Sequence, residues 1–382
     1  MNLNIKQKFD SILGYTLIAL NLLPAKILGF FLRRNHKITH APNRIVFIKL
    51  LGLGSIFMAL DSIQSIKNKY PAAKLILITS KNIKPGTIPL GIFDGVLAID
   101  DKNIFTLIST AFQTLLNLWK YKNTWIVDLE VYSKLSTIFS LWTLARNRFG
   151  FYLNSVWFRF DLNTHNIYFN EFVIVEENYK SMAEALGCTS HQDFQYPLPQ
   201  NITINKNYIA INNTCSELGK ERLAEDVLIA ETMDWLIAHT SYQIALLGAP
   251  VDFKNNESFL NKYENLKSNP RIHNIAGKFS FNDYYNFLYA QCLLLVTVDT
   301  GPLHFARKLN VPTISLWGPT NPMTRIQEDS KNKLIYTHFK CSPCVHMVDV
   351  LPCNGDNQCM KQIKSTAIIN YLQEMLPIQT TK

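Results

Sequence analysis

The chain alternates short apolar runs with longer stretches in which apolar residues recur every three or four positions. The first run, RIVFIKL at 44–50, is nearly continuous, which is typical of a parallel strand buried on both faces. It ends in LGLGS, and the following IFMALDSIQSIKNKY has helical spacing. The runs KLILITS, GVLAID and TWIVDLE continue the alternation. This pattern predicts a doubly wound α/β domain over residues 41–190.

The same alternation starts again near Tyr208. The runs YIAIN, YQIALLG, LLLVTVD and TISLWG predict strands, and the stretches between them have helical spacing. A second α/β domain is therefore expected over residues 205–382, and the proline-containing, polar segment 188–207 is the predicted linker. In two such domains meeting at a cleft, ligands are expected at the carboxyl ends of the strands, beside helix N-termini.

Residues 1–40 form a separate apolar and basic arm. Its core, ILGYTLIALNLLPAKILGFFL at 12–32, is interrupted by Pro24 and Lys26 and flanked by basic residues. A signal peptide fits poorly, because no small-residue cleavage site follows. We expect two short helices lying in a membrane interface. The alternatives are a helix packed on the protein's own surface and a true membrane span.

The length and net charge of the chain limit its number of domains and the kinds of partner it can bind. The 382 residues are too many for one typical core, which favours two domains. The net charge of +9 and the many aromatic residues would suit nucleic acid, an anionic membrane or a phosphorylated substrate. Nucleic acid is not expected as a partner, because no long run of Lys and Arg is present.

The stretch LVTVDTGPLHFARKL carries the clearest candidate chemistry. Asp299 stands where a strand ends, and Thr300, Gly301 and Pro302 make a tight turn into a helix that carries His304. Amides at a helix start can bind an anion, and a glycine lets the backbone approach it closely. The alternative is an ordinary helix cap, in which Asp299 or Thr300 satisfies backbone donors.

The longer pattern D-T-G-P-x-H-x-A, followed by P-T-I-S-L-W-G-P-T-x-P, resembles the signature of glycosyltransferase family 9, best known for lipopolysaccharide heptosyltransferases. RIVFIKLLGLGSIFMALDSIQSIKNKYPAAKLILIT, WIVDLEVYSKLSTIFSLWTLARNRFGF and IALLGAP are similar to further parts of this family. The resemblance covers residues 40–376 and is strongest at 299–322. It implies two facing Rossmann-like domains, the GT-B architecture, and an inverting transfer from a nucleotide sugar without an obligatory metal or other cofactor.

The resemblance also implies a donor site. The loop at 299–304 would hold the diphosphate and ribose of the sugar nucleotide, because preorganised donors stabilise a leaving diphosphate. Lys220, in GKER, lies at a position similar to the family's phosphate-binding lysine, although it could be a solvated surface lysine. Thr320, in the GPT turn, is a further expected donor contact.

The acceptor side departs from the family pattern. An inverting transferase needs a general base, and the family is expected to carry an aspartate just after the glycine of the first loop. Here Gly54 is followed by Ser55, whose hydroxyl cannot act as the base unaided. Acceptor contacts are predicted at Gly54 and, in THNIYFNE, at Thr164 and His165. His165 is also a base candidate, although a single histidine is more often structural.

The segment VDLE offers another base. Asp128 and Glu130 are two residues apart on a predicted strand, so they share a face. We predict that Glu130 is the base and that Asp128 orients the acceptor or its partner. The alternative is that both cap a helix or pair with Arg146 or Arg148.

Four of the seven cysteines, Cys341, Cys344, Cys353 and Cys359, are spaced C-x2-C-x8-C-x5-C. Four thiolates in a short loop would suit a structural zinc. Two disulfides are possible too, although a nucleotide-sugar donor implies a reducing cytosol. The third alternative is free thiols.

Together these features predict a cytoplasmic glycosyltransferase, peripheral to the inner membrane. It would move heptose from ADP-heptose to a lipid-linked saccharide such as the lipopolysaccharide core. The alternative is a sugar-nucleotide-binding protein that has lost the reaction, as Ser55 suggests. An oxidoreductase is disfavoured, because GLGS lacks the full G-x-G-x-x-G pattern.

Overall fold

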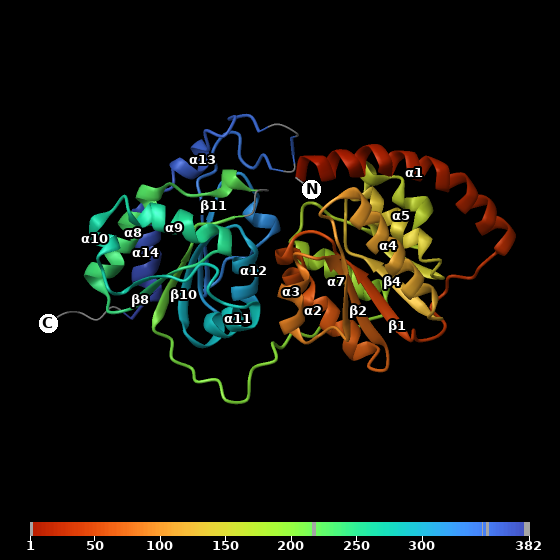
Figure 1. Ribbon diagram of the computed structural model, residues 1–382, viewed down its shortest axis with the longest axis horizontal. Helices are drawn as coiled ribbons and strands as arrows, with labels where there is room; N and C mark the ends of the chain where they lie inside the picture. The colour runs from red at the N-terminus through yellow and green to blue at the C-terminus, as the bar shows by residue number, and fades with distance from the viewer. Residues whose placement is uncertain (1–2, 216–218, 346, 349–350, 378–382) are drawn as a thin grey trace. The chain divides into compact units, whose positions relative to one another are not determined.

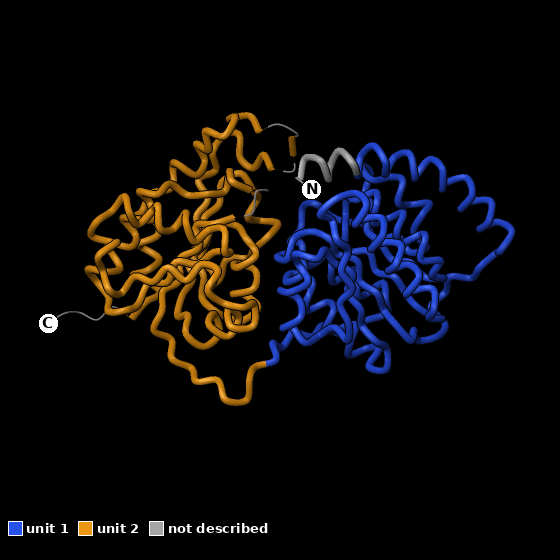
Figure 2. Tube along the Cα trace, viewed as in Figure 1, with its two compact units in different colours: residues 1–197 blue, residues 198–382 orange. Residues whose placement is uncertain are grey.

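The computed structural model describes residues 3–215, 219–345, 347–348 and 351–377, with side chains from residue 10 onward. The chain divides into two compact units, residues 1–197 (unit 1) and 198–382 (unit 2), which are coloured separately in Figure 2. Each unit is a parallel sheet covered by helices. This confirms the predicted class of two doubly wound α/β domains.

Unit 1 contains a six-stranded sheet in the order β3-β2-β1-β4-β5-β6. Its strands are β1 (Arg44–Ile48), β2 (Lys74–Ser80), β3 (Gly95–Ile99), β4 (Thr124–Asp128), β5 (Asn147–Tyr152) and β6 (His165–Tyr168). Its α-helices are α1 (Leu3–Leu32), α2 (Leu53–Lys69), α3 (Lys84–Thr87), α4 (Ile104–Trp119), α5 (Lys134–Trp142), α6 (Arg159–Leu162) and α7 (Val175–Ala185). Side chains of α4 and α5 share one apolar core with β1, β2 and β4, while α2 packs against α7.

Unit 2 contains a second six-stranded parallel sheet, in the order β12-β11-β10-β7-β8-β9. Its strands are β7 (Tyr208–Asn212), β8 (Gln243–Leu246), β9 (Ile272–Asn274), β10 (Cys292–Val298), β11 (Thr313–Trp317) and β12 (Asn332–Tyr336). Its α-helices are α8 (Asp226–His239), α9 (Phe253–Leu260), α10 (Glu264–Lys267), α11 (Phe281–Ala290), α12 (Gly301–Lys308), α13 (Gln358–Lys361) and α14 (Ser365–Met375). The helices α8 and α14 pack together and contribute to the main core of this unit.

The two sheets share one topology. Counted from the first strand of each unit, both follow the order 3-2-1-4-5-6, with the first and fourth strands adjacent. In such a sheet the order of strand addition reverses between these two strands, and ligands bind outside their carboxyl ends. The switch points are therefore the ends of β1 and β4 in unit 1, and of β7 and β10 in unit 2.

The N-terminal arm is one helix, and the prediction of two short helices is wrong. Pro24 lies inside α1 and removes only its own backbone donor. The helix continues because unit 1 holds it on both sides of the proline. Trp142 Nε1 donates to Asn21 Oδ1 at 3.0 Å, and Lys26 Nζ lies 3.0 Å from Asp161 Oδ2. Figure 1 shows α1 as one rod that bends toward its carboxyl end.

Candidate functional site

A buried ion pair lies at the switch point of unit 1. Because β1 and β4 are paired along their length, Lys49 and Glu130 leave the sheet at the same edge. Lys49 Nζ lies 2.7 Å from Glu130 Oε2. The other carboxylate oxygen accepts the backbone N–H groups of Leu50 at 2.7 Å and Leu51 at 3.0 Å. Glu130 is thus fixed to the loop that follows β1, with 11% of its side chain exposed.

Lys49 was missed by the sequence analysis. Burial by itself would lower the pKa of Lys49, but the attraction of Glu130 outweighs it and raises the pKa. Lys49 is therefore a charged partner of Glu130. The available signal was a lysine at the end of an otherwise buried apolar run, since a buried charge requires a partner.

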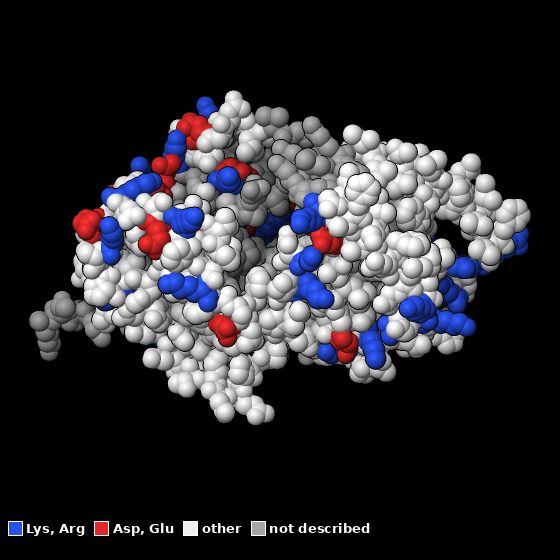
Figure 3. All heavy atoms as spheres, in the orientation of Figure 1, with Lys and Arg blue, Asp and Glu red and all other residues white. Residues whose placement is uncertain are grey.

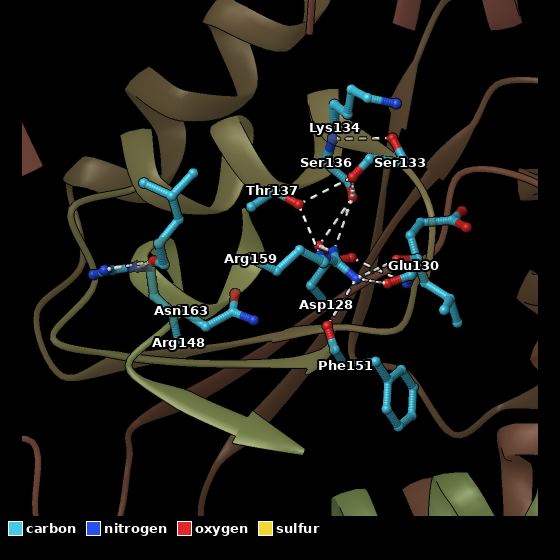
Figure 4. Close-up of polar contacts among 12 residues, drawn as sticks. Asp128, Glu130, Ser133, Lys134, Ser136, Thr137, Arg148, Phe151, Arg159 and Asn163 are labelled. Atoms are coloured by element: carbon cyan, nitrogen blue, oxygen red, sulfur yellow. Dashed lines mark hydrogen bonds and ion pairs between the residues drawn. The ribbon is translucent and has the colours of Figure 1, made fainter. Parts of the chain in front are cut away.

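Asp128, two residues before Glu130, forms a second ion pair with Arg159 (Figure 4). Its side chain is fully buried and pairs with the equally buried guanidinium of Arg159. Ser136 Oγ donates to Asp128 Oδ2 at 2.9 Å, and the Glu130 backbone N–H donates to Oδ1 at 3.0 Å. The pKa of Asp128 is raised by burial, and Arg159 opposes this shift. Because the Asp128 carboxylate is fully buried, it cannot contact an acceptor molecule. Instead of the expected contact with the acceptor, it holds Arg159, Ser136 and the loop after β4 in place.

Arg159 connects the loop after β4 to the neighbouring strand. Besides Asp128, it donates to the backbone carbonyls of Glu130, Val131 and Phe151. The alternative pairing with Arg146 or Arg148 is not seen: the arginine that pairs with Asp128 is Arg159, from α6. Arg148 instead donates to backbone carbonyls, including that of Ala145 at 2.7 Å. Arg159 therefore determines where Glu130 stands.

The predicted acceptor residues Thr164 and His165 are not near Glu130. They lie where β6 begins, at the amino edge of the sheet, whereas Glu130 follows the carboxyl end of β4. Thr164 Oγ1 bonds to the Arg148 backbone, and the His165 ring stacks on Phe149 with centroids 4.2 Å apart. Burial lowers the pKa of His165, and nearby cations add to the effect. These contacts are structural.

The first loop leads directly into α2. Gly52 has a positive φ of 80°, which permits the turn, and α2 starts at Leu53. Gly54 and Ser55 therefore lie in the first turn of a 17-residue helix. The partial positive charge of this helix end adjoins the loop whose amides bind Glu130. A polar acceptor group at this edge would meet Glu130 on one side and the start of α2 on the other.

At the switch point of unit 2, Asp299 lies between two basic side chains. Arg222 Nη1 is 3.5 Å from Asp299 Oδ2 and donates to the Asp299 carbonyl at 3.1 Å. His304 Nε2 is 3.4 Å from Oδ1. Burial by itself would raise the pKa of Asp299, but the hydrogen bond from His304 and the charge of Arg222 hold it below the ordinary value. Asp299 is therefore ionised and orients both basic groups.

The start of α12 carries no side-chain cap at Thr300, contrary to the alternative left open by the sequence. Thr300 Oγ1 instead accepts a hydrogen bond from Asn212 Nδ2 at 3.2 Å. Pro302 has no N–H, and the Leu303 amide bonds to the Thr300 carbonyl at 3.2 Å. The Gly301 amide, for which no bond to another described residue is seen, is a donor at the positive end of the helix.

Several buried polar atoms at this edge have no hydrogen-bond partner among the described residues. They include Nδ1 of His304, Nε of Arg222 and Oγ1 of Thr320. Thr320 follows β11, the neighbour of β10, and is 3% exposed. An unsatisfied buried polar group costs about 1–3 kcal/mol, so such groups are rare without a function. Several unsatisfied polar atoms close together are typical of a binding site in which a polar ligand supplies the missing hydrogen bonds.

Lys220 and Arg222 belong to the same 3-10 turn, but the structure uses them differently. Lys220 is exposed, whereas Arg222 contacts Asp299. The sequence analysis missed Arg222, together with Asn212 at the end of β7. Both are polar residues that follow a predicted strand or loop, yet their contact with the Asp299 turn depends on the pairing of β7 with β10.

The four clustered cysteines are free thiols in the structure. Burial raises the pKa of Cys359 to about 11 and also raises that of Cys344, which favours the protonated thiol. Within the described residues, no three or more His, Cys, Asp or Glu side chains are placed to hold a metal ion. The zinc site is not confirmed and remains a prediction.

The chain was compared with known proteins. The model of "Glycosyltransferase family 9 (heptosyltransferase)" matches residues 138–354, more than half of the chain. Lipopolysaccharide heptosyltransferase 1 of Campylobacter coli is 23% identical over 357 residues, covering 87% of this chain and 98% of the relative.

Two solved structures are similar in fold. The family 9 glycosyltransferase of Veillonella parvula has a TM-score of 0.70 at 17% identity and covers 89% of this chain and 99% of its own. The Escherichia coli ADP-heptose lipopolysaccharide heptosyltransferase II has a TM-score of 0.68 at 17% identity, with 87% and 98% covered. These likenesses agree with the GT-B fold class. The chain belongs to glycosyltransferase family 9, the heptosyltransferase family, and is a glycosyltransferase.

Proposed function

We propose that the chain transfers heptose from ADP-heptose to a lipid-linked saccharide of the lipopolysaccharide core, with inversion at the anomeric carbon. The observation that carries this proposal is the division of chemistry between the two switch points. Unit 1 presents a fixed carboxylate, Glu130, and unit 2 presents unsatisfied polar atoms around Asp299. Similarity to lipopolysaccharide heptosyltransferase 1 and to an ADP-heptose enzyme supports the choice of substrates.

In this proposal unit 2 binds the nucleotide. The Gly301 amide and the side chains of Lys220, Arg222 and Thr320 face the diphosphate and ribose. Asp299 holds Arg222 and His304 in place through its ionised carboxylate. As ADP departs, negative charge develops on the diphosphate, and donors already in position stabilise it.

Unit 1 would supply the base. The acceptor hydroxyl gives its proton to Glu130 while its oxygen forms a bond to the anomeric carbon. The bond from that carbon to the diphosphate oxygen breaks, and ADP leaves with the electron pair. Lys49 and the two loop amides hold the carboxylate in a fixed orientation before the step. Ser55 contributes only to the start of α2.

A second candidate is a sugar-nucleotide-binding protein without transferase activity. Two observations favour it: Ser55 stands where the family pattern has aspartate, and Glu130 already accepts three hydrogen bonds. In this case the donor site of unit 2 would still bind nucleotide.

We further propose that α1 holds the enzyme on the inner membrane surface. Residues 10–32 are apolar and long enough to cross a membrane by length and composition alone. However, Asp10 bonds to the start of α5 and Lys26 pairs with Asp161, so about 24 Å of the helix lies along unit 1. This arrangement supports a helix lying in the interface rather than a span.

The test is a transfer assay with purified protein, ADP-heptose or other nucleotide sugars, and extracted core lipid. Nucleotide release and acceptor mass are both measured. We expect Glu130→Gln to lower kcat by about 100- to 10,000-fold, the usual contribution of a general base. ADP affinity should change less than twofold, because Glu130 belongs to the other unit.

Two variants serve as controls. Ser55→Ala should retain most of the activity, and Glu171→Gln removes an exposed carboxylate that bonds only to Tyr132 among the contacts seen. Equal losses in Glu130→Gln and Glu171→Gln would contradict the assignment of the base. ADP binding without product from any donor would instead establish the second candidate.

A further inference from the structure

The positive charge of the chain is concentrated in three segments of unit 1. Residues 33–44, 118–126 and 143–148 together contain eight Lys and Arg and no Asp or Glu. Eight cations nearly equal the net charge of +9 of the whole chain. All three segments lie at the amino ends of β1, β4 and β5, at the edge opposite Glu130. In Figure 3, Lys and Arg gather on unit 1 where α1 ends and the chain leads into β1.

These segments line a pocket of about 920 Å³ that is open to solvent. Its basic lining residues are Arg34, Lys37, His40, Lys122 and Arg146. The described lining includes no carboxylate, and none of its Lys or Arg side chains forms an ion pair with a described residue. On β4 the pocket is lined by residues 124–126, at the amino end of the strand, whereas Glu130 follows its carboxyl end. It is therefore separate from the transferase site.

The fold holds the cations together without neutralising them. Arg146 Nε donates to the Asn35 carbonyl at 2.5 Å, and the His36 ring bonds to the Arg146 carbonyl at 2.6 Å. These contacts fix the segment after α1 against the loop before β5. The pKa of Arg148 is lowered to about 10, by burial and by the nearby charge of Arg34. Uncompensated positive charge of this kind favours an anionic ligand.

An exposed apolar surface extends from the pocket, which Trp119 at the end of α4 lines. On α4, an exposed stripe runs along the outer face at helical spacing: Phe105, Ile108, Phe112, Leu116 and Trp119. The last turns of α1, residues 26–32, are exposed on all sides and include two phenylalanines. Trp119 Nε1 donates to the Trp142 carbonyl at 2.9 Å, and Trp142 bonds to α1, so α4, α5 and α1 are joined. The surface over α1 and α4 is mostly uncharged in Figure 3.

We propose that this pocket binds the phosphate of an anionic lipid headgroup while α1 and α4 rest in the membrane interface. The inference rests on the proposed membrane location of the enzyme and adds a specific headgroup site to it. Cations beside apolar and tryptophan side chains match the layers of a membrane surface, in which phosphates lie just outside the acyl chains. The volume exceeds that of a phosphate ion and accommodates a glycerophosphate headgroup.

The pocket can be tested with sedimentation of vesicles, made of phosphatidylcholine alone or with 30% phosphatidylglycerol (roughly the anionic range in which surface charge acts). The variant Arg34→Gln/Lys37→Gln/Lys122→Gln removes three lining cations. Its matched control, Lys254→Gln/Lys267→Gln/Lys331→Gln, removes three exposed lysines of unit 2. We expect the pocket variant to lose on the order of 100-fold in affinity for anionic vesicles, since each cation at such a surface contributes about fivefold. The control should lose less than threefold.

Other outcomes have definite meanings. Equal losses in both variants would overturn the site in favour of bulk charge, and no loss in either would overturn it outright. Glycerol 3-phosphate that displaces the protein from vesicles, where chloride at equal ionic strength does not, would support a phosphate pocket. If soluble phosphate binds the protein but vesicles do not, the lipid assignment is wrong.

The same variants separate this proposal from the proposed function. With acceptor dispersed in detergent, the pocket variant should transfer sugar at the wild-type rate, because Glu130 lies at the other edge. Failure of every donor to react in the wild type would remove the proposed function while leaving the vesicle result intact.

Discussion

The end of β1 and β4 in unit 1 and the end of β7 and β10 in unit 2 occupy the same place in the same strand order. In unit 1 the charged groups at this place satisfy one another: Lys49 pairs with Glu130, and Arg159 pairs with Asp128. In unit 2 the helix start lacks a side-chain cap, and polar atoms around Asp299 have no partner within the described chain.

One topology can thus support two uses of its switch point. Where every charge has a partner, the edge is rigid before substrate arrives and can present a single carboxylate in a fixed direction. Where hydrogen-bond donors at the edge have no protein partner, a ligand can accept their hydrogen bonds. Part of the free energy of ligand binding then comes from these bonds. The difference lies in which side chains follow the strands, since the backbone arrangement is shared.

The largest effect is expected from breaking the rigid edge. Arg159→Leu leaves Asp128 buried without its cation, which typically costs about 3–5 kcal/mol of unfolding free energy. Denaturant unfolding of unit 1, followed by circular dichroism, measures this loss. The control is Arg271→Leu in unit 2, where the guanidinium binds only the carbonyls of Thr240 and Ile237 among the contacts seen. A loss in Arg159→Leu no larger than in the control would show that the ion pair does not carry the rigidity.

A smaller effect is expected from closing the open edge of unit 2. Thr300→Asp adds a negative charge at the start of α12, where the diphosphate is expected to bind. ADP affinity, measured by calorimetry, should fall at least about tenfold, since a like charge in contact costs more than about 1.4 kcal/mol at low effective dielectric. Thr300→Ser keeps the hydroxyl that binds Asn212 and should bind ADP as the wild type does. Ser280→Asp changes the cap of α11 and should also leave binding unchanged; a tenfold loss there would mean that any added charge weakens binding.

The smallest effect concerns acid. The folded-state pKa of Asp299 is below the unfolded value, so its stabilisation is present above about pH 4, the unfolded pKa, and is lost as pH falls through the folded pKa. The difference in unfolding free energy between wild type and Asp299→Asn should therefore be constant near neutrality and shrink in acid. The variant Asp234→Asn is the control. Because burial raises the pKa of Asp234, its pH dependence should have the opposite sign to that of Asp299→Asn. A difference independent of pH would show that Asp299 acts through shape rather than charge.

The strands of both units could be read from the sequence because buried parallel strands are continuous apolar runs. The turn at Asp299 could also be recognised locally, because its residues are consecutive. By contrast, Lys49 meets Glu130 across 81 positions, and Arg159 lies 31 positions from Asp128. Such pairs depend on strand order and helix packing, which residue patterns do not encode.

The misplacement of Thr164 and His165 has a related cause. The run that contains them has the composition of a strand, but composition does not reveal which end of the sheet its polar residues occupy. Likewise, the proline in α1 predicted a break, and the tertiary contacts of Asn21 and Lys26 override it. The local sequence pattern thus identified the helices and strands. The contacts of the polar residues at their ends could be assigned only from the assembled sheet.

The contact made by Asp10 limits how the arm can be removed. Its carboxylate accepts Ser133 Oγ at 2.8 Å and the amides of Lys134 at 3.1 Å and Leu135 at 3.0 Å, at the start of α5. Ser133 is three residues beyond Glu130. A shortened chain that begins at residue 41, made to improve solubility, would therefore lose a helix cap next to the loop that carries Glu130. Low activity of such a truncated chain could then have two causes, a disordered loop or a missing membrane anchor. Adding back a peptide that contains Asp10 would distinguish them, because it would restore the cap of α5 without attaching the chain to a membrane.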